Sequence, residues 1–479
     1  MQPLKILFSA LNSQGHVNAC IAIAELLAPR GHEITFAVTS GWKELIEKHN
    51  FKYIEIVVNE PDDDFDSDYN DEKNGVNGSD DNNNTNTNGV NGHSENGGDT
   101  KNNDVKDKKA TFLIDYISTM FAELRHKTWD RFKYFDEKWA KLNCKLFAFF
   151  GALDEPLAGV LDSVKPDLVI VDTLFWLPCL MKTTIPWISL WSCNPLLIYD
   201  DLPPFGSGFP TRGPRSEWEE FDSINSEKYR PVYEHNRRWL AKRGITVTEE
   251  KPKYHLLESP FLNIYNYPEI LDYSDICKKP ERWFRVDSAV REPDEKNPFK
   301  VPENLVNKPG KLIYFSLGSM ASIDLELMKR VLACLAKAPH RFIVSKGPLH
   351  EQIDLADNMW GDRYVNQIGI LPHVDLVITH GGNNTLTESL YFGKPVIVMP
   401  ICFDQHDNAQ RIVEKGLGLR VETYHFQDHE LLEAIEKILN DDEIYGKLAD
   451  VKAQLRASST RDQVCQLIEQ TAVLKRCPL

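Results

Sequence analysis

The sequence lacks several features that would each mark a particular class of protein. No apolar run approaches the roughly 20 residues that a membrane-spanning helix requires. The nine cysteines are scattered, without a C-x-x-C pair or metal-ligand spacing, which is typical of free thiols in a reducing compartment. Positive charge is in deficit, and the formal net charge of -16 disfavours nucleic acid and anionic membrane surfaces as partners.

The N-terminus lacks the layout of a signal peptide, because residues 3–11 read directly as a buried strand. We therefore expect a cytoplasmic protein without a membrane anchor. The turn after this strand lacks the G-x-G-x-x-G spacing, which disfavours a dinucleotide-dependent dehydrogenase.

One long segment has almost no apolar residues. Residues 60–108 are mainly Asn, Asp and Gly, so they cannot bury enough surface to offset the entropy of ordering. We interpret this segment as a disordered surface insertion, with an acidic interaction segment as the alternative. Helical spacing follows in residues 112–139.

The rest of the chain alternates buried strands with helical patterns. The runs KILFSA, DLVIVD, PWISLW, LIYFSL, DLVITH and PVIVMP are nearly unbroken and apolar, which indicates strands buried on both faces of parallel sheets. The sequence therefore predicts an α/β fold, and its length of 479 residues allows two domains.

The most informative stretch is residues 364–405. A strand pattern ends at His380 and passes through Gly381 and Gly382 into a helical pattern. Such a junction is a ready anion site, because free N–H groups and the positive end of the helix dipole face the ligand. Asn384 and Thr385 add side-chain donors. An ordinary strand-to-helix crossover with a glycine turn is the alternative interpretation.

Carboxylate and amide groups nearby suit the rest of a nucleotide sugar. Glu388 lies one helical turn after Asn384, where it could accept hydrogen bonds from ribose hydroxyls. Asp404 and Gln405 follow the next buried strand, at the carboxyl end where open α/β sheets bind ligands. This pair could hold sugar hydroxyls.

This stretch resembles the signature of the family 1 UDP-glycosyltransferases, which plant members show as W-x-P-Q … H-x-G-W-N-S-x-x-E … D-Q. The match runs residue by residue through His380, Gly382, Asn384, Thr385, Glu388, Asp404 and Gln405. The front half departs from the plant form. Aligning Gln367 with the family's Gln places Tyr364, which precedes Val365, at the first Trp of the signature, the one that stacks on uracil. Asn383 stands at the second Trp, the one before N-S.

The resemblance implies a GT-B architecture, in which two Rossmann-like parallel-sheet domains face each other across a cleft. We expect an acceptor-binding domain in residues 1–285 and a linker in residues 286–309, which are rich in proline and polar residues. The donor-binding domain would occupy residues 310–455. Residues 456–479 would form a helix that returns to the first domain.

His16 follows Gly15 at the first strand-to-helix turn, where a capping or loop histidine is the usual interpretation. The resemblance makes His16 the catalytic base and Asp172, which ends another buried strand, its partner. A neutral imidazole could accept the proton of an acceptor hydroxyl as that oxygen attacks C1 of the sugar. Asp172 would fix the tautomer and stabilise the imidazolium that forms. A single displacement of this kind inverts the anomeric centre.

The resemblance also assigns the remaining site residues. No metal or bound cofactor is expected, and UDP-glucose is the expected co-substrate, since Gln at the last signature position accompanies glucose in the plant enzymes. The acceptor would be a small lipophilic molecule, as in detoxification, and we expect a monomer. Besides the signature residues, the donor site would include Gly15, Gly318, Ser319 and Gln367, and the acceptor pocket Phe112, Phe175, Trp191 and Asn194.

Two other functions remain open. A UDP-sugar epimerase could share the fold and the phosphate site, but it would not need the aromatic, variable region after Trp191. A catalytically inactive relative could bind nucleotide or lipophile without turnover.

Overall fold

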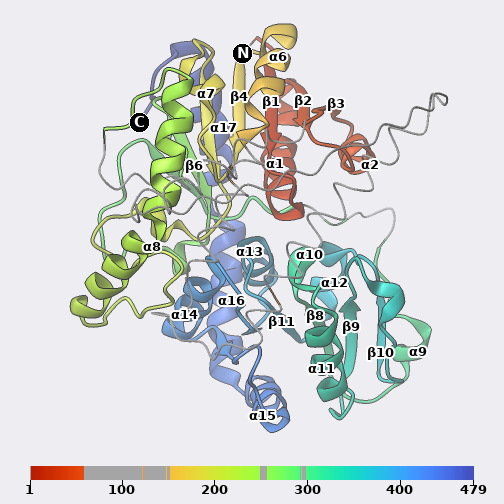
Figure 1. The fold of residues 1–479 in the computed structure, drawn as a ribbon. Coiled ribbons are helices and arrows are strands. Elements are labelled where there is room, and N and C mark those ends of the chain that lie inside the picture. The colour runs from red at the N-terminus through yellow and green to blue at the C-terminus, as the bar shows by residue number, and fades with distance from the viewer. Residues whose placement is uncertain are drawn as a thin grey trace, which may run out of the picture.

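The computed structural model describes residues 2–58, 121, 147, 151–248, 256–291, 293 and 298–479. Their strands form two separate parallel sheets, one above the other in Figure 1. This arrangement confirms the predicted α/β class with two Rossmann-like sheets. The insertion at residues 60–108, the helix predicted at residues 112–139 and Phe112 lie outside the described residues, apart from position 121.

The first sheet has seven strands in the order β3-β2-β1-β4-β5-β6-β7. Every residue of β4 and β5 is buried, as their apolar runs predict for strands covered on both faces, and every residue of β6 is buried as well. The strands are β1 (Lys5–Ala10), β2 (Glu33–Val38), β3 (Lys52–Glu55), β4 (Leu168–Asp172), β5 (Trp187–Trp191), β6 (Leu262–Asn266) and β7 (Trp283–Val286).

The second sheet has six parallel strands in the order β10-β9-β8-β11-β12-β13. Its central strands β8 and β11 are buried throughout. The strands are β8 (Leu312–Ser316), β9 (Arg341–Ser345), β10 (Met359–Asp362), β11 (Leu376–Thr379), β12 (Val396–Val398) and β13 (Gly418–Arg420).

Helices cover both sheets (Figure 1). With the first sheet go α1 (Gln14–Leu27), α2 (Lys43–Lys48), α6 (Asp154–Val164), α7 (Pro178–Lys182), α8 (Arg215–Lys242) and α17 (Thr460–Leu474). With the second go α9 (Glu303–Val306), α10 (Gly318–Ala321), α11 (Leu325–Leu335), α12 (Gln367–Ile370), α13 (Asn383–Tyr391), α14 (Gln405–Lys415), α15 (Asp428–Leu439) and α16 (Asp442–Ala457). Short 3-10 turns occupy Ala28–Arg30, Pro195–Ile198, Glu269–Leu271, His350–Gln352 and Leu371–His373. Within the described segments, no helix has the length and apolar character needed to cross a bilayer.

Each sheet has a topological switch point, where the chain reverses its direction of travel across the sheet. In the first sheet β1 lies between β2 and β4, and in the second β8 lies between β9 and β11. Open α/β sheets bind ligands at such a point, outside the carboxyl ends of the strands. The loops that follow β1, β4, β8 and β11 are therefore the places to look for a site.

The chain passes between the two sheets twice, and the two passages lie side by side. It leaves the first sheet after β7 and returns between α16 and α17. The backbone N–H of Asp287 donates to Thr460 Oγ1 at 3.0 Å, and Ser458 Oγ donates to the Asp287 carboxylate at 2.5 Å. These bonds hold the outgoing and returning segments together.

Helix α17 is anchored to the first domain by a buried carboxylate. Glu469 accepts hydrogen bonds from Arg30 Nε at 2.6 Å and Nη2 at 2.8 Å, and it lies 3.0 Å from His32 Nε2. The hydrogen bonds from Arg30, together with His32, lower the pKa of Glu469 to about 2. The ionised carboxylate therefore stabilises the docked helix at every pH above its unfolded pKa near 4.5.

We expect Glu469→Gln to lower the free energy of unfolding by about 1.5–3 kcal/mol at pH 7, the range for hydrogen bonds to charged groups. Urea unfolding followed by circular dichroism measures this change. Because the folded pKa is depressed, the difference from wild type should persist above pH 5 and shrink as the pH falls toward 2. The exposed neighbour Gln470 provides the matched control Gln470→Ala, and equal stability of all three proteins would contradict the assigned anchor.

Candidate active site

His16 and Asp172 meet at the switch point of the first sheet. His16 is the third residue of α1, and Asp172 is the last residue of β4, opposite Ala10 at the end of β1. His16 Nδ1 lies 2.8 Å from Asp172 Oδ1, and Asp172 is fully buried. The backbone therefore brings together two side chains that are 156 positions apart in the sequence.

The environment of His16 defines its tautomer and raises its pKa. Burial alone would lower the pKa, but the charge and the hydrogen bond of Asp172 and the charge of Asp404 together raise it above 6.5. An ionised carboxylate can only accept, so Nδ1 carries the proton and Nε2 carries the lone pair. Ser192 Oγ lies 3.1 Å from the same Nδ1 and supports this orientation.

The glycine turn after β11 forms the N-terminus of α13 at the second switch point. Gly381 has a φ of 90° and Gly318, after β8, has a φ of 74°, a region that side chains rarely adopt. The imidazole of His380 packs against Gly318 and Gly382. A Cβ atom at either glycine would lie 2.6 Å from a ring atom of His380, so both positions require glycine.

The same packing keeps His380 neutral. Burial lowers its pKa to about 4, although a hydrogen bond with the backbone of Ser316 partly offsets this. His380 is therefore a neutral hydrogen-bonding group beside the free N–H groups of α13 at physiological pH. Ser319 and Thr385 are half-buried at the same place. This arrangement is suited to binding an anion.

Glu388 is buried in α13 and already has partners. Gln367 Nε2 donates to Glu388 Oε2, and Arg291 Nη2 lies 3.5 Å from Oε1. Burial raises the pKa of Glu388, while Arg291 and Gln367 oppose the rise. Gln367 also accepts from the hydroxyl of Tyr314 at 3.1 Å, so the carboxylate and the amide form one connected network.

Tyr364 has an accessible ring. It is 46% exposed, and the guanidinium of Arg363 lies 5.4 Å from its centroid, while Val365 packs on the core of the second domain. An exposed ring of this kind could stack on a planar base.

Asp404 and Gln405 begin α14 and make different contacts. Asp404 accepts from the backbone N–H of Asn194 at 2.8 Å, and burial raises its pKa to about 6 although that N–H and His16 oppose the rise. Gln405 Oε1 accepts from the backbone N–H groups of Ile401 at 2.9 Å and Cys402 at 3.2 Å. Gln405 Nε2 donates to Cys402 Sγ at 3.7 Å, so both ends of this amide bond to its own loop.

The residues expected at the acceptor pocket lie in two different environments. Phe175 packs edge-on against Phe147 at 4.5 Å, in an apolar cluster with residues of α8. Trp191 is instead buried in the interdomain core, and Asn194 is fully buried with its amide bonded to Tyr267, Tyr273 and Asn408. Neither Trp191 nor Asn194 has a side chain at an open surface in this structure.

Sequence reasoning missed the side-chain role of Asn383. Its Nδ2 donates across the interface to the backbone oxygens of Ser192 and Asn266, each at 2.9 Å. Asn384 Nδ2 makes a similar bond to the oxygen of Gly15 at 2.7 Å. The signal available in the sequence was the polar Asn383 at a position where the plant signature has Trp.

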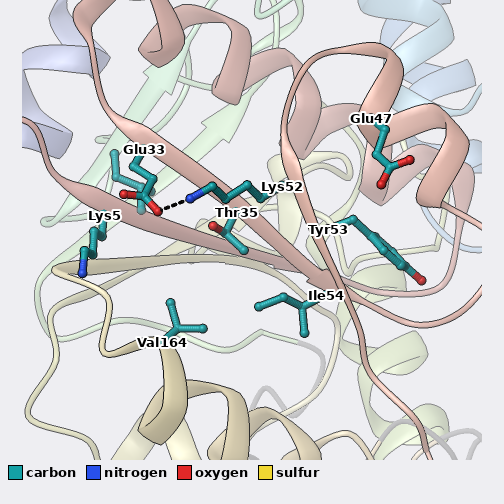
Figure 2. A pocket seen from close by; sticks show the side chains of 9 residues that line it. Lys5, Glu33, Thr35, Glu47, Lys52, Tyr53, Ile54 and Val164 are labelled. Atoms are coloured by element: carbon teal, nitrogen blue, oxygen red, sulfur yellow. Dashed lines mark hydrogen bonds and ion pairs between the residues drawn. The ribbon is translucent and has the colours of Figure 1, made fainter.

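A separate hollow of about 550 Å³ lies at the amino ends of β1, β2 and β3 (Figure 2). Lys5, Glu33 and Lys52 line it, and Glu33 pairs with Lys52 at 2.5 Å. This hollow lies at the opposite end of the strands from His16 and Asp172, so it is not part of the site described above.

The half-buried, neutral His380 predicts a specific pH dependence. Its folded pKa lies below its unfolded pKa of about 6.5, so the unfolded state gains a proton first and stability is lost as the pH falls from 6.5 to 4. Glutamine cannot titrate, so we expect His380→Gln to lose about 1–2 kcal/mol less unfolding free energy than wild type over this pH range. The expected difference is modest because the ring is partly exposed to water. Urea unfolding at several pH values tests this, with the exposed His429→Gln as control. Parallel pH profiles for wild type and His380→Gln would contradict the assignment.

Comparison with known proteins agrees with this geometry. Residues 293–453 match the family model for UDP-glucuronosyl and UDP-glucosyl transferases. The chain is 36% identical over 107 residues to the zeaxanthin glucosyltransferase of Pseudescherichia vulneris, which covers 22% of this chain and 26% of that protein. It is 32% identical over 148 residues to human UDP-glucuronosyltransferase 2B10, covering 30% of this chain and 28% of that protein. The matched segments thus span less than a third of the length of these curated relatives.

Solved structures extend the similarity to the whole chain at the level of fold. The calicheamicin glycosyltransferase CalG4 superposes with a TM-score of 0.62 and 16% identity, covering 100% of both chains. The glycosyltransferase SsfS6 of Streptomyces sp. SF2575, complexed with thymidine diphosphate, superposes with a TM-score of 0.56 and 15% identity, covering 98% of this chain and 99% of that chain. The chain therefore has the GT-B fold, and its residues 293–453 carry the segment that the family model describes.

Proposed function

We propose that the protein is an inverting UDP-glycosyltransferase that transfers glucose to a hydroxyl of a small lipophilic acceptor. One observation carries the proposal: the His16–Asp172 pair and the anion site of α13 meet at the same interface, where Asn384 Nδ2 bonds to the oxygen of Gly15, next to His16. In this proposal, His16, which accepts the proton of the acceptor hydroxyl, therefore lies next to the helix N-terminus that binds the leaving diphosphate.

The reaction is a single displacement at C1 of the sugar. His16 Nε2 takes the proton of the acceptor hydroxyl while the acceptor oxygen forms a bond to C1. The bond between C1 and the phosphate oxygen breaks, and UDP leaves with the electron pair. Asp172 stabilises the imidazolium that forms, and the N-terminus of α13 with His380 stabilises the charge on UDP. Attack opposite the leaving group gives a β-glycoside from an α-linked donor.

The donor binds to the second domain and the acceptor to the first in this proposal. Residues 310–455 supply the ring of Tyr364, the network of Glu388 and Gln367, and the Asp404–Gln405 pair. Residues 1–285 supply His16 and the apolar cluster that contains Phe175. Glucose is favoured because Gln405 stands at the signature's last position, and one of the relatives is a glucosyltransferase. The free cysteines of the described segments support a reducing, cytoplasmic environment.

Replacement of the proposed base tests the reaction directly. We expect His16→Ala to lower kcat by about 10²–10⁴-fold, the range for a general base, while UDP affinity stays within about threefold. Product formation from UDP-glucose with a panel of lipophilic alcohols and phenols measures the first quantity, and isothermal calorimetry with UDP measures the second. His49→Ala, which removes a histidine paired with Glu25 on the other side of α1, is the matched control. Near-wild-type turnover of His16→Ala would remove the base assignment, and a wild-type protein that binds no UDP would refute the function.

The effect of Asp172 on His16 predicts a pH profile. Protonation of His16 should make kcat/KM fall as the pH drops through an apparent pKa above 6.5. We expect Asp172→Asn to lower kcat by about 10- to 1,000-fold and to move this acidic limb to lower pH, because the negative charge that raises the pKa is gone. A limb that stays in place would assign the titration to a group other than His16.

A further inference from the structure

The first turn of α13 reaches across the interface with two side chains. Asn383 and Asn384 are its first two residues, and each donates its amide N–H groups to backbone oxygens of the first domain. Asn383 bonds to Ser192 and Asn266, and Asn384 bonds to Gly15. Helices α1 and α13 are in contact, and α13 lies below α1 in Figure 1.

These contacts fall on both sides of His16. Gly15 immediately precedes His16 at the start of α1. Ser192 Oγ lies 3.1 Å from His16 Nδ1, the nitrogen that also bonds to Asp172. The amide of Asn383 therefore holds the backbone of a residue whose side chain touches the base.

The geometry at Asn383 favours an amide over any similar side chain. Asn383 is 4% exposed, and it bonds to the carbonyl oxygens of Ser192, directly after β5, and of Asn266, the last residue of β6. Among the described residues, its own Oδ1 has no hydrogen-bond partner, so the side chain acts at this place only as a donor. An apolar residue would leave two buried carbonyl groups unpaired, and a carboxylate would repel both.

We propose that Asn383 is a positioning residue that ties the donor-phosphate helix α13 to the loops that orient His16. The inference rests on the proposed function and goes beyond it, because it makes the orientation of the base depend on the contact between the two domains. Asn383 touches neither reactant through its side chain. Its backbone N–H remains at the helix N-terminus whatever the side chain, so its loss should alter turnover and not nucleotide affinity.

The kinetic test uses the full-length Asn383→Leu variant, which keeps the branched shape of the side chain but has no donor. We expect kcat to fall about 10- to 100-fold, while the dissociation constant of UDP and the KM for UDP-glucose stay within about threefold. Asn383→Ser keeps one donor but cannot reach both oxygens, so its kcat should fall about 3- to 10-fold. This variant replaces Asn383→Leu in the test if the leucine variant fails to fold. Lys415→Ala is the matched control, because it removes a different interdomain contact, to Asp275 at 2.7 Å. Its kcat should stay within about twofold of wild type.

A second measurement reports on His16 without using turnover. Diethyl pyrocarbonate modifies accessible neutral imidazoles, and peptide mass spectrometry gives the rate at the peptide that contains His16. With UDP saturating, we expect this rate to rise at least about threefold in Asn383→Leu and to stay unchanged in Lys415→Ala, because only the first variant releases the loops around the 9% exposed His16.

The two measurements separate the possible outcomes. Lower kcat with faster labelling of His16 and unchanged UDP affinity supports the proposal. Unchanged kcat and labelling, or a loss of kcat that matches a loss of UDP affinity, overturns it. If no variant, including wild type, transfers sugar but Asn383→Leu still speeds labelling, the proposed function fails while the positioning contact stands.

Discussion

Burial of polar groups between the two sheets is the constraint on which the active site depends. Asp404, Asn408 and Asn194 are almost completely removed from water, and each has at least one hydrogen-bond partner on the opposite domain. A buried polar group without a partner costs free energy, so only one relative placement of the domains satisfies all of them. That placement also brings the carboxyl ends of β1 and β4 toward those of β8 and β11.

Helix α14 provides the largest share of this polar interface. Its residues at positions 404, 407, 408, 411 and 414 follow helical spacing and so lie along one face. Asp407 accepts from the backbone N–H groups of Gly206 and Gly208, Arg411 donates to the oxygens of Leu271 and Asp272, and Glu414 accepts from Thr211. The helix whose N-cap is Asp404 therefore also holds the loop at residues 204–213 of the first domain.

The sequence was sufficient for the features that depend on local pattern. Unbroken apolar runs located the central strands β1, β4, β5, β8, β11 and β12, and the turn after β11 located Gly381, Gly382 and the start of α13. The adjacency of His16 and Asp172 follows from parallel strands that end at one edge, although their roles came from the family resemblance. Local pattern therefore predicted the strand ends and turns at which these residues lie, and their roles stay predictions.

Partners that come from distant parts of the chain could not be predicted in this way. Ser192 is 191 positions from Asn383, and Arg291 reaches Glu388 from outside the second sheet. Trp191 and Asn194 follow a buried strand, as expected, but packing between the domains turns them into the interface and away from a pocket. Such contacts depend on how two finished domains fit, which no local periodicity encodes.

The paired passages of the chain at Asp287 and Ser458 have a mechanical consequence. Two covalent connections that cross an interface far apart would prevent the domains from separating, whereas two that cross together leave one axis of rotation free. Because Asp287 bonds to both Ser458 and Thr460, the two connections cross as one joined unit. Linked crossings of this kind can act as a single hinge, so they restrict separation of the domains less than two widely spaced crossings would.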